Sequence, residues 1–153
     1  MGKGHLSCVV KTFGRRWAMG ASFELQVQQA VENPELFRSA VKEGLDIVWF
    51  DHLAELFGAT AGEFAEVVGI DPRTLTRRRN DGKLTTRESS SLYHLAVLYV
   101  HSLGVLGSPE AVRGWLHAPE PDFADMKPFD LLDTAPGIQE VDQLLGRIEH
   151  GVF

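Results

Sequence analysis

Residues 64–78 read FAEVVGIDPRTLTRR, and this stretch decides the fold because it predicts two short helices joined by a tight turn. Gly69 can adopt the left-handed backbone conformation that ends many helices. Asp71 is a preferred residue at the position before the first turn of the next helix. We therefore predict helices at about residues 60–68 and 72–79, in the layout of a helix-turn-helix.

The second helix of this motif is strongly basic, although the whole chain has a formal net charge of -6. Residues 70–87 hold six basic and two acidic side chains, a net charge of +4. Ile70 and Leu75 are apolar and can hold the two helices together, which leaves the basic side chains to face outward. Arginine pairs with guanine in the major groove, and threonine can contact bases or phosphates. We therefore predict a DNA-binding surface formed by Arg73, Thr74, Arg77, Arg78, Arg79 and Lys83.

A solvated basic face near a helix C-terminus is the simpler alternative, since cations are favourable there in any case. The glycine turn, the capped helices and the inward Leu75 occur together with the charge, and this combination favours nucleic acid. Within the predicted surface, Arg79 and Lys83 suit phosphate contacts, which position a protein without reading sequence.

The rest of the chain predicts an all-α fold, because apolar residues recur at three- and four-residue steps and not in alternation. Thr60 with Glu63, and Thr85 with Glu88, match the capping box that begins a helix. We expect three parts, which are an irregular N-terminal arm (residues 1–32), a helical region with the helix-turn-helix (residues 33–107) and a C-terminal region (residues 108–153).

Composition excludes several classes of function. Cys8 is the only cysteine, so the chain can form neither an internal disulfide nor a cysteine-rich zinc site. His94 and His101 could share a helix face, but no third ligand has useful spacing, so we read the histidines as structural or surface residues. No motif of a catalytic nucleophile or a phosphate-binding loop is present, and we expect no enzyme activity, metal or cofactor. With no long apolar run, we expect a cytoplasmic protein that does not enter a membrane.

Four segments also resemble a known family, the Xre/MbcA/ParS-type antitoxins that accompany RES-domain toxins in bacterial toxin–antitoxin pairs. They are GIDPRTLTRRRNDGKLTTRES, GSPEAVRGWLHAP, KPFDLLDTAPGIQEV and LLGRIEHGV, and the match covers about two-thirds of the chain from Gly44 onward. The most specific parts are the Trp-Leu-x-x-Pro step at residues 115–119, PFDLLDT…G at residues 128–137 and the RIEHGV ending.

The resemblance implies an Xre-like helix-turn-helix core followed by a small helical toxin-binding region, with no enzyme activity of its own. The toxins of this family consume NAD, and the antitoxin is expected to place its C-terminal segment at the toxin active site. In this chain that segment is Arg147, Ile148, Glu149, His150, Gly151, Val152 and Phe153. Trp115 and Leu131 are further candidate toxin contacts, although a tryptophan in a short helix is often a core residue.

The charge of the C-terminal part agrees with this expectation. Residues 109–153 hold three basic and nine acidic side chains, and an NAD-binding cleft is usually electropositive. Glu149 and the terminal carboxylate could compete for such a cleft, or Arg147 and His150 could meet acidic residues within it. The chain departs from the family at Ala124 and Asp125, where a glycine pair is common, so the resemblance does not predict the local loop conformation.

The partners expected are therefore a RES-domain toxin and operator DNA, with a homodimer and a larger hetero-oligomer with toxin as the assemblies. Repression of the chain's own operon would place it at the nucleoid when it is bound to DNA. A stand-alone transcription regulator whose C-terminal half only dimerises is the alternative, because a short amphipathic helix can serve a homodimer equally well. A protein inhibitor without DNA binding is a third reading.

Overall fold

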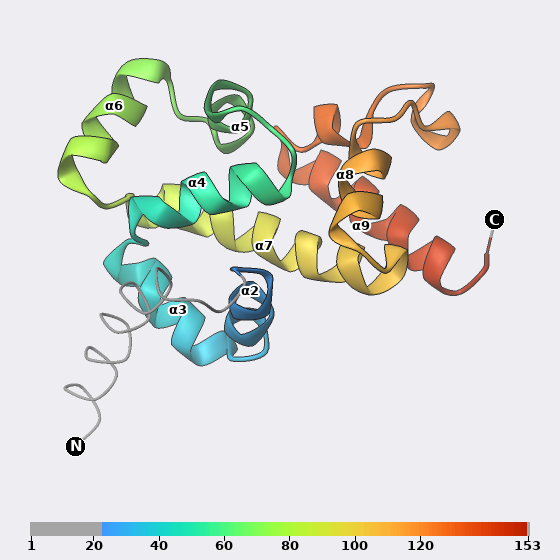
Figure 1. The fold of residues 1–153 in the computed structure, drawn as a ribbon, viewed down its shortest axis with the longest axis horizontal. Coiled ribbons are helices and arrows are strands. Elements are labelled where there is room, and N and C mark those ends of the chain that lie inside the picture. The colour runs from blue at the N-terminus through green and yellow to red at the C-terminus, as the bar shows by residue number, and fades with distance from the viewer. Residues whose placement is uncertain (1–22, 153) are drawn as a thin grey trace.

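The computed structural model describes residues 23–152, and these residues form an all-α fold without a β-strand (Figure 1), as predicted. The eight α-helices and two short 3₁₀ helices of the described part are α2 (Phe23–Val31), α3 (Pro34–Glu43), α4 (Ile47–Leu56), α5 (Ala61–Val68), α6 (Pro72–Asp81), α7 (Thr86–Leu106), α8 (Pro109–Leu116), η1 (Pro121–Phe123), η2 (Pro128–Leu131) and α9 (Ala135–Glu149).

Helix α7 is the centre of the molecule, and α2, α3, α4, α5, α8 and α9 all pack against it. Its buried side chains include Leu92, Leu95, Ala96 and Tyr99, which recur at three- and four-residue steps as the sequence predicts. Tyr99 is fully buried, and this burial raises the pKa of its hydroxyl to about 12. Because α7 is 21 residues long, it links the two halves of the chain through one continuous helix.

The predicted helix starts are present at α5 and α7. The Thr60 hydroxyl accepts a hydrogen bond from the Glu63 amide at 3.2 Å, and the Glu63 carboxylate accepts one from the Thr60 amide at 2.8 Å. Thr85 and Glu88 make the same reciprocal pair at 3.2 and 2.9 Å. Each capping box satisfies backbone donors that have no partner inside the helix, and it fixes the residue at which the helix begins.

The expectation of an irregular arm over residues 1–32 is wrong for its last third, because Phe23–Val31 forms α2. Val27 and Ala30 are buried against the core, and this packing stabilises the helix. Residues 1–22 of the arm lie outside the described residues. Helix α3 begins at Pro34, and the side chain of Asn33 before it makes no capping hydrogen bond.

Within residues 23–152, no single helix combines the length and apolar composition needed to cross a membrane. Residues 86–106 and 109–123 reach that composition only as a pair, with a bend of 109° between them. The same part of the chain contains no group of three or more His, Cys, Asp or Glu side chains placed to hold a metal ion.

Candidate nucleic-acid and partner-binding surfaces

Helices α5 and α6 form the predicted helix-turn-helix. Gly69 has a φ of 84°, in the left-handed region, and its amide donates to the Ala65 carbonyl at 2.8 Å. Asp71 then begins α6, because its carboxylate accepts hydrogen bonds from the amide and the hydroxyl of Thr74 at 2.9 and 2.8 Å. These bonds hold the pKa of Asp71 below its ordinary value. Ile70 and Leu75 are buried, as the motif requires.

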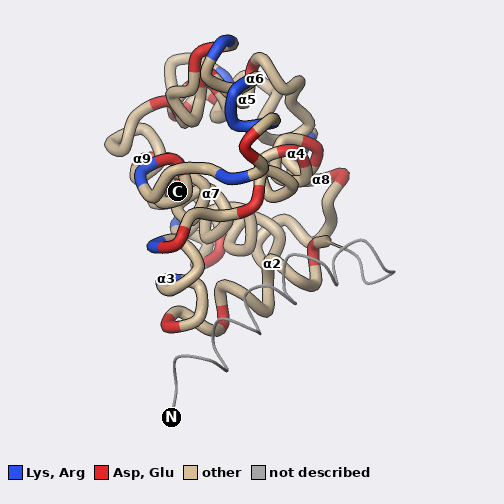
Figure 2. Tube along the Cα trace, turned by 90° about the vertical axis from the view of Figure 1, so that its left-hand side faces the viewer, with Lys and Arg blue, Asp and Glu red and all other residues tan. Residues whose placement is uncertain are grey.

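The free basic side chains of this surface are Arg73 and Arg77 on α6 and Lys83 in the turn after it. All three are exposed, and none forms an ion pair with another residue that the structure describes. Arg73 and Arg77 are four residues apart, so they lie on one face of the helix. Figure 2 shows the basic segments of α6 at one end of the molecule, away from α2 and α3.

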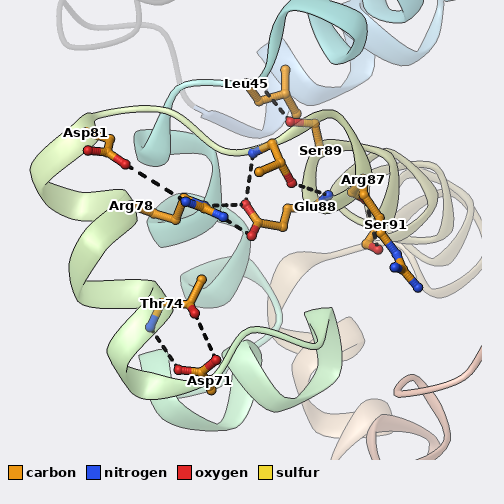
Figure 3. Close-up of polar contacts among 10 residues, drawn as sticks. Leu45, Asp71, Thr74, Arg78, Asp81, Arg87, Glu88, Ser89 and Ser91 are labelled. Atoms are coloured by element: carbon orange, nitrogen blue, oxygen red, sulfur yellow. Dashed lines mark hydrogen bonds and ion pairs between the residues drawn. The ribbon is translucent and has the colours of Figure 1, made fainter.

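Arg78 is placed differently from its neighbours on α6. Its Nε donates to both carboxylate oxygens of Glu88, at 3.1 and 2.9 Å, and its side chain is only 15% exposed (Figure 3). Burial would raise the pKa of Glu88, but the hydrogen bonds from Arg78 and the Thr85 amide outweigh it and lower that pKa. In this arrangement the ion pair of Arg78 and Glu88 connects α6 to the start of α7.

Arg79 is exposed but paired across to α4. Its two terminal nitrogens donate to the two carboxylate oxygens of Asp51, each at 2.8 Å. A bidentate arginine–carboxylate pair has the same geometry as an arginine–phosphate pair. Asp51 therefore occupies the donors that Arg79 would present to a DNA backbone.

The turn after α6 is fixed by the loop between α3 and α4. The Leu84 amide donates to the Leu45 carbonyl at 2.9 Å, and the Ile47 amide donates to the Gly82 carbonyl at 3.0 Å. The Leu45 amide donates in turn to the buried hydroxyl of Ser89 at 2.8 Å (Figure 3). The exposed side chain of Lys83 therefore projects from a backbone segment that hydrogen bonds at Gly82 and Leu84 hold on both sides.

The C-terminal region is built on a close approach between η2 and α9. A Cβ atom added to Gly137 would overlap the carbonyl oxygen of Leu131, so this position requires glycine. The Gly137 amide donates to the hydroxyl of Thr134, which caps α9, at 3.1 Å. This geometry gives a physical reason for the spacing of threonine and glycine in PFDLLDT…G.

Trp115 and Leu131 are both half-buried and pack against the hydrophobic core. The indole nitrogen of Trp115 donates to the Glu120 carboxylate at 3.1 Å, so the tryptophan holds the loop that follows α8. Each side chain keeps part of its surface at the outside of the molecule.

The C-terminal segment continues from α9 into an ordered turn. The Gly151 amide donates to the Ile148 carbonyl at 3.2 Å, the Val152 amide donates to the Arg147 carbonyl at 2.9 Å, and Gly151 has a φ of 65°. This is the Schellman pattern of helix ends. Val152 is 59% exposed, whereas Ile148 is half-buried; Phe153 lies outside the described residues.

Two ion pairs hold the last turns of α9. Arg147 donates to the Asp122 carboxylate of η1 at 3.3 Å. The carboxylate of Glu149 lies 3.3 Å from Nε2 of His101 on α7. His150, which completes the helix end, is exposed. Arg147 and Glu149, which the sequence assigns to a partner, therefore already have partners within the chain.

Ala124 and Asp125 adopt left-handed backbone conformations, with φ of 54° and 64°. This region of conformational space favours glycine. Two residues that are not glycine therefore hold the loop between η1 and η2 in a conformation that favours glycine.

Sequence reasoning misses three residues that shape these surfaces, which are Asp51, His101 and Asp142. Asp51 and His101 lie 28 and 41 residues from their partners, Arg79 and Asp142, so no local pattern links them. The one sequence pattern that could have indicated the contact with His101 is on α9, where Asp142 and Glu149 are seven residues apart and must therefore share a face.

Comparison with known proteins agrees with this architecture. Residues 37–97 match the model of the antitoxin Xre-like helix-turn-helix domain. Residues 104–151 match the model of the antitoxin Xre/MbcA/ParS C-terminal toxin-binding domain. The two matches divide the chain within α7, between the free basic residues and the C-terminal segment.

The chain is 30% identical over 116 residues to antitoxin Xre of Yersinia enterocolitica, which covers 74% of this chain and 78% of that protein. It is 28% identical over 114 residues to antitoxin Xre of Photorhabdus laumondii, covering 73% and 77%. A crystal structure of the M. tuberculosis MbcT–MbcA toxin–antitoxin complex contains a chain with the same fold, at a TM-score of 0.52 and 24% identity, covering 69% of this chain and 94% of that one. Members of this family bind toxins and are not enzymes. The chain therefore belongs to the Xre family of antitoxins, with a helix-turn-helix domain followed by a C-terminal toxin-binding domain.

Proposed function

We propose that this antitoxin inhibits a RES-domain toxin that consumes NAD, by placing residues 147–153 at the toxin active site, and that it represses its own operon through α6. The observation that carries the proposal is the ordered turn at the end of α9, which lies at the opposite end of the molecule from α6, the helix that carries the free arginines (Figure 1). One chain can therefore hold toxin and DNA on separate surfaces.

The DNA half of the proposal is supported by α6. Arg73 and Arg77 are the cations free to contact base edges, with Thr74 beside them and Lys83 free to contact a phosphate. Arg79 becomes a phosphate contact when it leaves Asp51, and Arg78 supports the helix from behind through Glu88. A single short helix reads few base pairs, so we propose a homodimer that binds two half-sites and places the protein at the nucleoid.

The toxin half is supported by charge and by the resemblance of the C-terminal ending. Residues 109–153 are strongly acidic, which suits a cleft that must attract the phosphates of NAD. Val152 supplies exposed apolar surface at the tip, and Trp115 and Leu131 supply partly exposed surface nearer the core. We propose that residues 33–107 serve DNA and residues 108–153 serve the toxin, in a larger hetero-oligomer.

The test is to purify the chain with the product of the adjacent gene and to measure NAD turnover by that product. We expect turnover to fall in proportion to added antitoxin and to stop near equimolar amounts. Unchanged NAD turnover at a stoichiometric excess of the chain would refute the inhibition of an NAD-consuming toxin. A complex that forms without any NAD-consuming activity in the free partner would refute the RES assignment alone.

A further inference from the structure

His101 joins the middle of the molecule to the last turns of α9. Its Nδ1 lies 2.7 Å from Oδ1 of Asp142, and its Nε2 lies 3.3 Å from Oε2 of Glu149. The two acidic residues are seven positions apart on α9, so both carboxylates face α7. One imidazole on α7 therefore bridges two carboxylates, and the second of them belongs to the C-terminal segment.

The two contacts depend on the protonation of the ring. A neutral imidazole has one N–H, whereas an ionised carboxylate can only accept hydrogen bonds. Both contacts are hydrogen bonds only when His101 is an imidazolium. When the ring loses a proton, the N–H stays with Asp142 at the shorter distance, and the lone pair of Nε2 then faces the Glu149 carboxylate. The contact to Glu149 is therefore the one that opens.

We propose that His101 is a proton-dependent positioning residue for the C-terminal segment. As the imidazolium it holds the end of α9 in the geometry that enters the toxin, and as the neutral ring it releases Glu149. The proposal rests on the proposed function, in which residues 147–153 act at the toxin active site. A held segment loses less conformational freedom on binding, so the held form binds more tightly.

The charges around the ring give the direction of the pH dependence. Partial burial by itself would lower the pKa of His101, but the two carboxylates outweigh burial and raise that pKa above its ordinary value. The other helices nearby carry three charged groups, which are Glu24 of α2 and Glu110 and Arg113 of α8. These groups lie on the far side of α7, where they act on the pKa of Tyr99 and not on that of His101. Helices α3 and α6 meet α7 near its start, through Tyr93 and Glu88.

A folded-state pKa above the unfolded value means that the bridge stabilises fully below about pH 6.5, the ordinary pKa of histidine. That contribution is lost as the pH rises through the folded-state pKa. We therefore expect tighter toxin inhibition in mildly acidic solution than in alkaline solution. In the chain alone, we expect the contact between His101 and Glu149 at the end of α9 to open over the same pH range.

The experiment compares the wild-type chain with three variants of α7. His101→Arg keeps a positive charge at every pH, His101→Gln removes it at every pH, and His94→Gln is the matched control on an exposed histidine of the same helix. The inhibition constant toward the toxin is measured for each protein at about pH 6 and about pH 8.5. Ratios between proteins at one pH cancel the pH dependence of the toxin itself.

We expect the wild type and the control to match His101→Arg at the lower pH and to approach His101→Gln at the higher pH. The weakening should be about two- to tenfold, as expected for releasing one ordered side chain. Equal inhibition by all four proteins at both pH values would overturn the positioning role while leaving the proposed function intact.

A second measurement uses the free chain, so it does not depend on the toxin. The titration of the His101 ring is followed by NMR with and without the change Glu149→Gln, which should lower its midpoint. A midpoint that does not respond overturns the bridge whatever the toxin does. Absence of inhibition by the wild type at either pH would instead refute the proposed function.

Discussion

Gly137 shows how a single residue sets the geometry of the partner-binding region. Glycine inside a helix is normally unfavourable, because it leaves the unfolded backbone more freedom than alanine does. Here the absence of a Cβ atom lets Gly137, the third residue after the cap of α9, lie against the Leu131 carbonyl. The packing of η2 on α9, and with it the direction of the C-terminal segment, depends on that close approach.

We expect Gly137→Ala to lower the free energy of unfolding by about 1–3 kcal/mol, because η2 must move away from α9. Gly146→Ala is the matched control in the same helix, since a Cβ atom there meets nothing within 4 Å. That change should raise stability by about 0.5–1 kcal/mol through helix propensity. Denaturant unfolding of both variants measures the two changes in the free energy of unfolding. Equal changes would show that the close approach of η2 to Gly137 does not contribute to stability.

Asp51 acts on Arg79 as a phosphate would, so its removal should favour DNA. We expect Asp51→Asn to strengthen operator binding and to steepen its salt dependence, by a slope of about 0.9 for one additional phosphate contact. Glu55→Gln, on an exposed acidic residue of the same helix, removes equal charge without releasing Arg79. The two variants should therefore differ in affinity and in salt dependence when operator binding is measured over a range of salt concentrations.

At the scale of elements, the position of α6 depends on contacts with residues outside its own sequence. Arg78 binds Glu88 at the start of α7, and the turn after α6 pairs with the loop before α4. These contacts hold both α6 and its following turn, so the exposed arginines are presented from a fixed backbone. Arginines of the same helix therefore have different roles, because Arg78 supports α6 whereas Arg73 and Arg77 remain exposed for the proposed DNA contacts.

Glu88→Gln tests the support of α6. We expect a loss of about 1–3 kcal/mol at neutral pH, since a hydrogen bond between charged groups is removed. The folded-state pKa of Glu88 is lowered, so the stabilisation is present above the ordinary pKa of 4.5 and is lost as the pH falls through the folded-state value. The difference between variant and wild type should therefore shrink in acid, which unfolding at neutral and acidic pH measures.

Arg73→Ala combined with Arg77→Ala tests the exposed face of α6. Each base contact of this kind contributes about 1–3 kcal/mol, so operator affinity should fall at least about tenfold with little change in stability. Arg38→Ala, on an exposed arginine of α3, is the control for loss of charge. Operator binding that tolerates the double change at moderate salt would favour a protein inhibitor that does not bind DNA.

The elements themselves could be predicted from the sequence wherever a local signal marks an end. Thr60, Asp71 and Thr85 begin helices as predicted, and Gly69 ends one. Helix α2 could not be predicted, because the tertiary packing of Val27 and Ala30 that stabilises it is not a local pattern. The roles of Arg78 and Arg79 could not be predicted, since their partners are distant in sequence and only the fold brings them together.

At the scale of the whole molecule, α7 separates two surfaces of opposite character. Helix α6, which carries the free arginines, lies at one end of the long axis, and the last turns of α9 lie at the other (Figure 1). The basic end suits a nucleic acid, and the acidic C-terminal region suits an electropositive cleft.

The most direct test of the proposed inhibition titrates toxin NAD turnover with the full chain and with a chain that ends at Leu145. The shorter chain keeps the buried residues Val141, Leu144 and Leu145 and loses the proposed blocking segment. We expect the full chain to stop turnover near equimolar amounts, and the shorter chain to bind the toxin while turnover continues. Full inhibition by the shorter chain would contradict the account and would move the blocking surface to Trp115 and Leu131.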